Sequence, residues 1–231
     1  MKTLALINEK SGAVSAVGVK NCINHLYEHS GREDIDIEIA AGEPQSLIDC
    51  AQSATERRDI DEAIVIGGDG TIAAIAGVLS NTDIPMAPLP GGTMNAFSRD
   101  LGYDGDLLTA IEQLSSVAPL AVDIAYAGRF AFLNNVVFGT YTSVAESRER
   151  IRDVETIGEK MEAITEVIGA LAHSDSESYR ITADGDSEDV VTNTLMVSNN
   201  LYAGAELLRP VRERVNAGVL GLYVANSTSP F

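Results

Sequence analysis

The sequence has no tryptophan, only two cysteines and three histidines, and no apolar run that approaches the roughly 20 residues needed to cross a bilayer. Neither cysteine has a C-x-x-C partner and the histidines do not follow H-E-x-x-H spacing, so no common zinc motif is present. We therefore expect both cysteines to be reduced core residues. The N-terminal MKTLALINEKSG lacks the apolar segment of a signal peptide, which favours a cytoplasmic protein.

Basic residues are also scarce. Lysine and arginine together number 16 against 34 aspartates and glutamates, for a formal net charge of −18. A surface this acidic repels phosphate backbones, so we expect no nucleic-acid partner. A small anionic ligand is still compatible, because backbone amides or a bound metal can create a local positive site. Two arginine clusters are interpreted either as ion pairs on a solvated helix face or as a patch facing phosphates or an anionic membrane: Arg148, Arg150 and Arg152, and Arg209, Arg212 and Arg214.

The first half of the chain alternates strand-like and helix-like segments. Short apolar runs predict strands at 3–8, 35–40, 63–66 and 85–89, and helical spacing of apolar residues predicts helices at 16–28, 45–56, 72–79 and 96–101. This order predicts an α/β fold with a parallel sheet and helices on both faces. Ligands of such sheets lie beyond the carboxyl ends of the strands.

The pattern changes near residue 119, where we place a boundary between a domain at 1–119 and a second domain at 120–231. The second domain is expected to be rich in antiparallel strands, at 121–126, 130–137, 178–183, 190–198 and 219–225. One long helix is predicted at 144–172. Asp184-Gly185-Asp186 is interpreted as the turn of a hairpin.

A strand of four apolar residues runs directly into Gly67-Gly68-Asp69-Gly70-Thr71, and a predicted helix follows. Glycines allow a ligand to approach the backbone closely, and the amides at a helix N-terminus attract anions. Asp69 could hold Mg²⁺ or accept a proton from an attacking hydroxyl. The alternative is a tight turn with an N-capping Asp or Thr.

A second loop, Pro90-Gly91-Gly92-Thr93-Met94-Asn95, also connects a strand to a helix, and a polar turn at 8–12 follows the first strand. All three would lie at the carboxyl edge of one sheet and could cradle a polyphosphate, with Lys10 or Arg99 as a counter-charge. Neither glycine loop matches the P-loop or the dinucleotide-binding fingerprint.

The two loops together are similar to those of a known family. GGDGT at 67–71 and PLPGGTMNAFSRDLG at 88–102 resemble the diacylglycerol kinase catalytic-domain family, which includes bacterial lipid kinases and sphingosine kinases and is distantly related to NAD kinases. NEKSG at 8–12, FLNNVVFGTYTSVAESRERIR at 132–152, IGEKMEAITEVIGAL at 157–171 and SNNLYAGAELLRPVRERVNAGVLGLYV at 198–224 also resemble that family. The resemblance covers nearly the whole chain.

The resemblance implies a kinase that transfers the γ-phosphate of ATP to the hydroxyl of diacylglycerol or a similar lipid, with ATP in the cleft between the two domains. Asp69 would serve catalysis and bind Mg²⁺, whereas Glu146 and Arg150 would lie near the substrate. The residues implied at the nucleotide are Asn8, Ser11, Gly12, Gly67, Gly68, Gly70, Thr71, Gly92, Thr93 and Asn95, the last of which would order its loop. A lipid substrate implies transient contact with a membrane, and the resemblance is compatible with a homodimer.

The chain departs from the family pattern at two points. The family's Asp-x-Gly in the late turn is here Asn216-Ala217-Gly218, so an amide replaces an acid. The family also continues into a segment with an Asp-Gly-Glu motif whose Asp is regarded as the general base, and we expect its absence to leave an exposed sheet edge. Two alternatives to a lipid kinase therefore stay open: a nucleotide- or lipid-binding protein without catalysis, and an NAD kinase-like enzyme.

Overall fold

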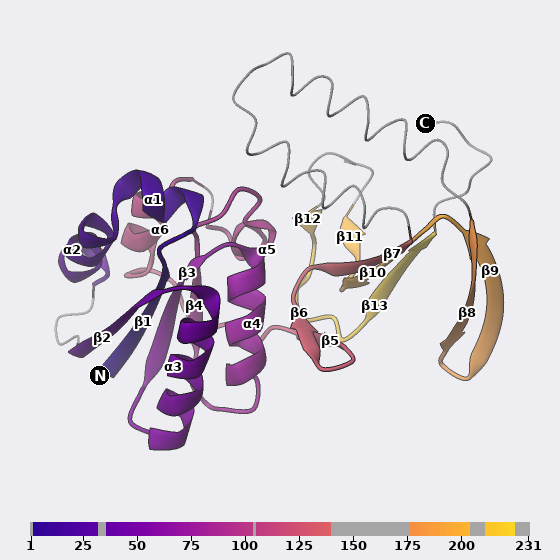
Figure 1. Ribbon diagram of the computed structural model, residues 1–231, viewed down its shortest axis with the longest axis horizontal. Coiled ribbons are helices and arrows are strands. Elements are labelled where there is room, and N and C mark those ends of the chain that lie inside the picture. The colour runs from indigo at the N-terminus through magenta and orange to yellow at the C-terminus, as the bar shows by residue number, and fades with distance from the viewer. Residues whose placement is uncertain (1, 32–35, 104, 140–175, 204–210, 225–231) are drawn as a thin grey trace, which may run out of the picture. The chain divides into compact units, whose positions relative to one another are not determined.

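The computed structural model describes residues 2–31, 36–103, 105–139, 176–203 and 211–224 (Figure 1). The chain divides into two compact units. Unit 1 comprises residues 1–134 and 199–219, and unit 2 comprises residues 135–198 and 220–231. In the described part of the chain, no helix is both long and apolar enough to cross a membrane.

Unit 1 is built on a four-stranded parallel sheet, as predicted. The strands lie in the order β2-β1-β3-β4, with bounds β1 Lys2–Asn8, β2 Asp36–Gly42, β3 Glu62–Gly67 and β4 Met86–Pro90. The register pairs Leu6 of β1 with Val65 of β3, and Ile66 of β3 with Leu89 of β4. All four strands are parallel, so their carboxyl ends, and the loops that follow them, lie along one edge.

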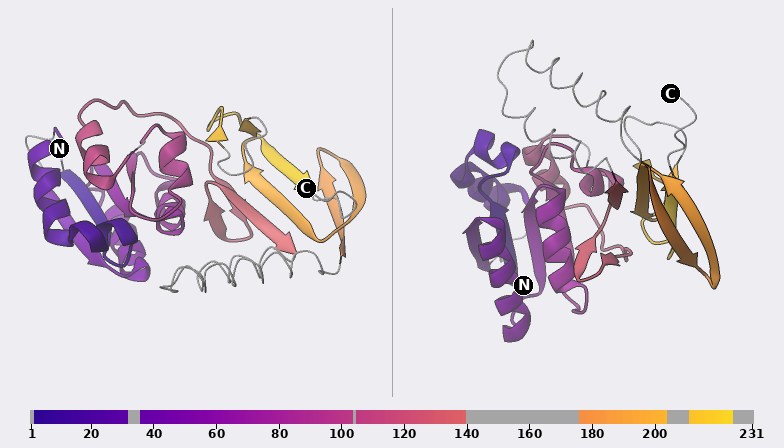
Figure 2. Two further views of the ribbon diagram at one scale, coloured as in Figure 1. Left: turned by 90° about the horizontal axis from the view of Figure 1, so that it is seen from above. Right: turned by 45° about the vertical axis from the view of Figure 1, so that its right-hand side comes forward.

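Helices cover both faces of this sheet, also as predicted (Figures 1 and 2). Alternate residues of β1 point to opposite faces, so Leu4 and Leu6 join one buried core and Ala5 and Ile7 join the other. Helices α3 (Pro44–Arg57) and α4 (Asp69–Leu79) pack into the first core. Helices α1 (Gly12–Val17), α2 (Val19–His29) and α6 (Leu107–Gln113) pack into the second.

Two local features of unit 1 differ from the sequence-based expectation. The predicted helix at 16–28 is instead two helices, α1 and α2, because Gly18 adopts a φ of 87° that a continuous helix does not allow. Helix α6 was not predicted at all. Its signals are present, because Asp106 caps it and Leu107, Ala110 and Ile111 follow helical spacing into the core.

Unit 1 extends beyond the expected boundary at residue 119. A short hairpin of β5 (Ala125–Ala127) and β6 (Phe130–Phe132) belongs to it and packs on α4. The approach is so close that a Cβ added to Gly77 of α4 would lie 2.8 Å from the Cβ of Ala131. Unit 1 also contains the short helix α5 (Ala96–Asp100) and the paired strands β11 (Tyr202–Ala203) and β12 (Val211–Arg212).

Unit 2 contains antiparallel strands, as expected. The single strand predicted at 130–137 is wrong, because a bend at 133–134 separates β6 from a new strand that begins at Asn135. A three-stranded sheet has the order β13-β10-β7, with bounds β7 Asn135–Gly139, β10 Thr194–Asn199 and β13 Leu220–Val224. Strands β8 (Glu177–Ala183) and β9 (Asp186–Thr192) form a hairpin whose turn, Asp184-Gly185, has positive φ at both residues, which confirms the predicted turn. The helix predicted at 144–172 lies outside the described residues.

Candidate active site

Three loops of unit 1 are joined by hydrogen bonds at the carboxyl edge of its sheet. The amide Nδ2 of Asn8, at the end of β1, donates to Oγ1 of Thr71 in α4 at 2.9 Å. The backbone of Gly91, after β4, donates to the carbonyl of Gly67 at 2.9 Å and accepts from Ala13 at 3.0 Å. The polar turn after β1 and the two glycine loops therefore form one continuous surface.

Gly91 and Gly92, which we call the packed glycines, are required where the two glycine loops touch. A Cβ on Gly91 would lie 2.7 Å from the backbone nitrogen of Gly67, and a Cβ on Gly92 would lie 2.7 Å from the Cα of Gly68. Real Cβ atoms do not approach backbone atoms this closely, so a side chain at either position would force the loops apart.

Gly12 and Gly70, which we call the open glycines, have no such requirement. A Cβ at either position would meet no protein atom within 4 Å, and neither residue has a positive φ. Both residues are exposed and lie in the first turn of a helix, Gly12 in α1 and Gly70 in α4. Packing within the protein therefore does not explain why these positions lack a side chain.

The second glycine loop is closed by its own asparagine. Asn95 accepts a hydrogen bond from the backbone nitrogen of Gly92 through Oδ1 and donates to the Gly92 carbonyl through Nδ2, both at 2.8 Å. It has the left-handed backbone conformation, which asparagine tolerates better than most residues. Thr93 lies exposed between these two residues.

Asp69, the first residue of α4, is fixed through one carboxylate oxygen. Its Oδ1 accepts from the backbone nitrogen of Phe97 at 3.1 Å and from Nδ2 of Asn134 at 2.9 Å. Its Oδ2 accepts no hydrogen bond from the described part of the chain. The side chain thus combines a fixed orientation with one available oxygen.

A buried arginine lies behind Asn134. Arg212 of β12 is 4% exposed and forms an ion pair with Asp100, the last residue of α5, with 2.7 Å between Nε and Oδ2. Its Nη2 also donates to Oδ1 of Asn134 at 2.5 Å. Both sequence interpretations of the arginine clusters placed Arg212 at the surface, which is wrong. Its partners are too distant along the chain for local sequence to reveal them.

The expected counter-charges have different surroundings. Lys10 forms an exposed ion pair with Glu43, and its hydrogen bond lowers the pKa of that carboxyl. Arg99 lies in α5, and its Nε is buried without a hydrogen-bond partner in the described part of the chain. The substrate candidates Glu146 and Arg150 lie outside the described residues.

The ten residues expected at the nucleotide all belong to the three loops or to the helix starts beside them. They are Asn8, Ser11, Gly12, Gly67, Gly68, Gly70, Thr71, Gly92, Thr93 and Asn95. Sequence reasoning did not identify Asn134 as a site residue. A signal was available, since Asn134 is the asparagine of the F-x-N stretch in FLNNVVFG.

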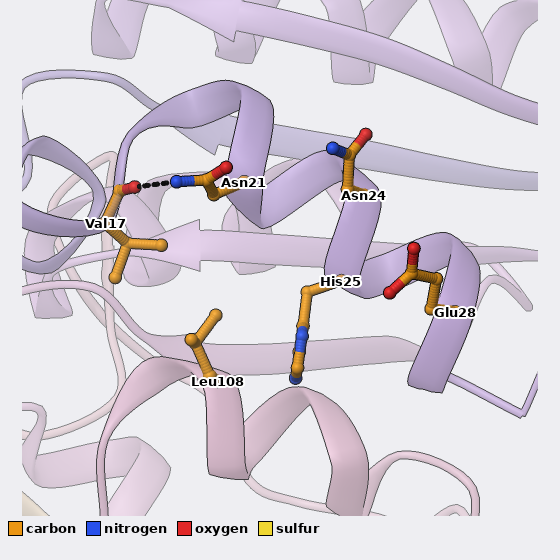
Figure 3. Close-up of a pocket in the computed structure, with 6 residues that line it drawn as sticks. All are labelled: Val17, Asn21, Asn24, His25, Glu28 and Leu108. Atoms are coloured by element: carbon orange, nitrogen blue, oxygen red, sulfur yellow. Dashed lines mark hydrogen bonds between the residues drawn. The ribbon is translucent and has the colours of Figure 1, made fainter.

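A hollow on another part of unit 1 lies between α2 and α6 (Figure 3). It measures about 510 Å³ and is lined by Val17, Asn21, Asn24, His25, Glu28 and Leu108. Asn21 of α2 is turned toward the end of α1, where its Nδ2 donates to the carbonyl of Val17 at 2.8 Å. None of the lining residues belongs to the three loops, so this hollow is separate from the site around Asp69.

The sequence profile of the diacylglycerol kinase catalytic domain family matches residues 2–127, which is more than half of the chain. The chain belongs to this family of lipid kinases. The match includes the three loops and β5, and it confirms the resemblance inferred from GGDGT and PGGTMN. It ends before Asn134 and Arg212.

Individual relatives give the same result. A protein of Staphylococcus haemolyticus, provisionally named a lipid kinase, is 26% identical over 225 residues, which cover 88% of this chain and 72% of the relative. A Staphylococcus aureus protein with the same provisional name is 24% identical over 226 residues, covering 88% of this chain and 73% of the relative.

Solved structures from the family share the fold. A diacylglycerol kinase structure from Bacillus anthracis superimposes with a TM-score of 0.68 at 23% identity and covers 98% of this chain and 74% of its own. A second Bacillus anthracis structure, provisionally assigned as a diacylglycerol kinase, gives a TM-score of 0.71 at 22% identity, with 98% and 76% covered. The expected fold class is therefore confirmed.

Proposed function

We propose that the chain is an ATP-dependent lipid kinase that uses Asp69 and the three joined loops to transfer a phosphoryl group to a lipid hydroxyl, of diacylglycerol or a close relative. The observation that carries the proposal is Asp69 itself. One of its oxygens is held by Phe97 and Asn134, and the other is available at the start of α4, in the first glycine loop.

The open glycines support a nucleotide at this edge. No side chain caps α1 or α4, and Gly12 and Gly70 leave the space beside their first turns free. One amide of α1, that of Ala13, already donates to the carbonyl of Gly91, so the other amides of these turns are the ones available to an anion. A triphosphate could therefore approach the amides closely, as anions do at helix N-termini. Phosphoryl transfer depends mainly on positioning and charge neutralisation, which such loops can provide.

The residues present fit a Mg²⁺ ion that the protein binds together with the nucleotide, and not one that the protein binds alone. In the described part of the chain, no three His, Cys, Asp or Glu side chains come together as a metal site. Mg²⁺ at nucleotide sites commonly takes one or two carboxylates, with phosphates and water as the other ligands. Asp69 Oδ2 could be such a ligand, and the bound ion would neutralise charge that develops on the phosphates.

In the reaction, the lipid hydroxyl oxygen forms a bond to the γ-phosphorus while the bond from that phosphorus to the bridging oxygen breaks, and ADP leaves with the bonding electrons. The hydroxyl proton must pass to a base. Asp69 Oδ2 could accept it if Asp69 does not bind the metal. We further propose that unit 2 contributes to lipid binding and that the protein contacts the membrane transiently.

The test is transfer of labelled phosphate from ATP with Mg²⁺ to a panel of diacylglycerol, monoacylglycerol, ceramide, sphingosine and NAD. Wild type, Asp69→Asn and the control Asp83→Asn, which changes an exposed carboxylate after α4, are compared. We expect transfer to one lipid by wild type and the control, and a loss of about 10³-fold or more in Asp69→Asn.

Other outcomes would contradict the proposal in different ways. Transfer to NAD alone would make the protein an NAD kinase-like enzyme. Nucleotide binding, measured by calorimetry, without transfer to any acceptor would make it a binding protein. Equal transfer by wild type and Asp69→Asn would remove Asp69 from the reaction.

A further inference from the structure

The hydrogen bond from Asn134 to Asp69 requires one particular orientation of the Asn134 amide. An asparagine side chain can present either its oxygen or its NH₂ group to a neighbour. Only the NH₂ group can donate to Asp69 Oδ1, which it does at 2.9 Å. Whether Asn134 can donate to Asp69 therefore depends on which group binds the amide oxygen, Oδ1, of Asn134.

Arg212 determines that orientation. A guanidinium has only donors and is always charged, so the atom of Asn134 that faces it must be the oxygen. The distance from Nη2 of Arg212 to Oδ1 of Asn134 is 2.5 Å. With the oxygen bound there, the NH₂ group is directed at Asp69.

Arg212 itself has little freedom to move. It is buried, its Nε and Nη2 pair with Asp100, and its Nη1 donates to the backbone carbonyls of Leu133 and Asn199, the latter at 3.1 Å. The ring of Tyr202 lies 5.8 Å from the guanidinium carbon. A buried charge with this many partners cannot leave them without a large cost.

These contacts close into a ring. Helix α5 supplies both the Phe97 amide that donates to Asp69 and the Asp100 carboxylate that pairs with Arg212. Arg212 holds Asn134, and Asn134 returns to Asp69. Both donors to Asp69 Oδ1 are therefore fixed by the same buried ion pair.

We propose that Asn134 is a positioning residue for phosphoryl transfer, with its amide held by Arg212 so that Asp69 keeps Oδ1 bound and directs Oδ2 to the reaction. The proposal rests on the function proposed above. Asn134 contacts neither nucleotide nor lipid in this account and acts through Asp69. Losing its amide should lower kcat, because Asp69 can then rotate, and should change nucleotide affinity little, because the loop amides remain.

The experiment compares three variants of the whole chain. Asn134→Ala removes the amide. Asn134→Asp keeps the shape and the contact with Arg212 but has no group that donates to Asp69. Thr3→Ala is the control, because its buried hydroxyl donates to Oε1 of Glu62 at 3.1 Å, at the opposite end of β1 from Asn8 and outside the ring. The measurements are kcat and KM for ATP with the preferred lipid, Tm, and the NMR resonance of the Phe97 amide.

We expect kcat to fall about 10- to 100-fold in both Asn134 variants, because small misplacements of a catalytic group cost this much. KM for ATP should stay within about threefold, since binding is not made by this contact. The Phe97 amide resonance should shift in both Asn134 variants and not in the control. Thr3→Ala should lower Tm about as much as Asn134→Ala does and leave kcat within about twofold.

A purely structural role would give another pattern. Activity would then follow Tm across the three variants, and Asn134→Asp would be about as active as wild type, which would overturn the proposal. If wild type transfers no phosphate to any acceptor, the proposed function fails and the Phe97 resonance decides the positioning contact alone. An unshifted resonance in Asn134→Ala would then overturn the contact, and a shift absent from the control would support it.

Discussion

The packed glycines and the open glycines lie at the same sheet edge, yet a methyl group would act on them in opposite ways. At Gly91 it would collide with the backbone of Gly67, whereas at Gly70 it would meet nothing within 4 Å. The first kind of glycine joins the two loops, and the second leaves space beside helix amides. The edge thus has a closed side, held by the protein's own contacts, and an open side, which we assign to the nucleotide.

The largest expected effect on stability comes from Arg212→Leu, which breaks the buried ion pair with Asp100. Removing the guanidinium leaves the buried carboxylate of Asp100 unpaired, and breaking such a pair costs about 3–5 kcal/mol. Chemical denaturation should show this loss. The double variant Asp100→Leu/Arg212→Leu should recover part of it, and a double variant less stable than the single one would show that the ion pair is not the reason.

Gly91→Ala should have the next largest effect on stability. The added methyl group would lie 2.7 Å from a backbone atom that cannot move alone, and overpacking of this kind costs about 1–3 kcal/mol. The measurement is again the free energy of unfolding. Wild-type stability in this variant would mean that the two loops are not in contact as described.

Gly70→Ala should have the opposite effect, with unchanged stability and weaker binding of ADP. Alanine favours a helix by up to about 1 kcal/mol over glycine, so the variant should be as stable as wild type or slightly more so. Affinity for ADP should nevertheless fall about tenfold, a difference of about 1.4 kcal/mol, because the methyl group occupies the space beside the amides. Calorimetric titration measures the affinity, and an unchanged value would contradict a nucleotide on the open side.

The smallest expected effect concerns α6, whose N-terminus is capped by a side chain of the protein. Asp106 caps α6 by accepting hydrogen bonds from the backbone of Thr109 and Leu108, and these bonds lower the pKa of its carboxyl. Asp106→Ala should cost about 1 kcal/mol at neutral pH without changing ADP affinity.

The pH dependence of this cost has a definite sign. A carboxyl whose pKa is lowered by folding stabilises the protein above its ordinary pKa of about 3.9, and the benefit is lost as the pH falls below that value. The stability difference between wild type and Asp106→Ala should therefore shrink in acid. A difference that stays constant down to pH 2 would show that the ionised carboxylate is not the cap.

Local pattern was enough to predict the parallel sheet and the loops. The short apolar runs that became β1, β3 and β4 are buried and end in glycine, asparagine or proline, and the α/β alternation predicted that they are parallel, although it did not predict the strand order. The break at Gly18 could not be predicted in this way, because periodic apolar residues continue through it. A single backbone angle decides the break, and hydrophobic pattern does not report it.

The contacts of Asp69 could not be predicted for another reason. Its position after a strand and before a helix was evident in the sequence, but its partners Phe97 and Asn134 lie 28 and 65 residues away. The partner of Asp100 lies 112 residues away. Contacts this distant follow from the way the chain returns to unit 1 after unit 2, and nothing local in the sequence specifies that return.

The ring around Asp69 also has a consequence for the order in which the protein is made. Both cores of unit 1 are built from residues before Asn134, so they can form while the ribosome is still synthesising unit 2. Arg212 emerges last of the ring members, and until it arrives the Asn134 amide is free to turn either way. A nascent chain would therefore have a folded parallel sheet well before it had an oriented Asp69, and the ring would close only after Arg212 had been synthesised.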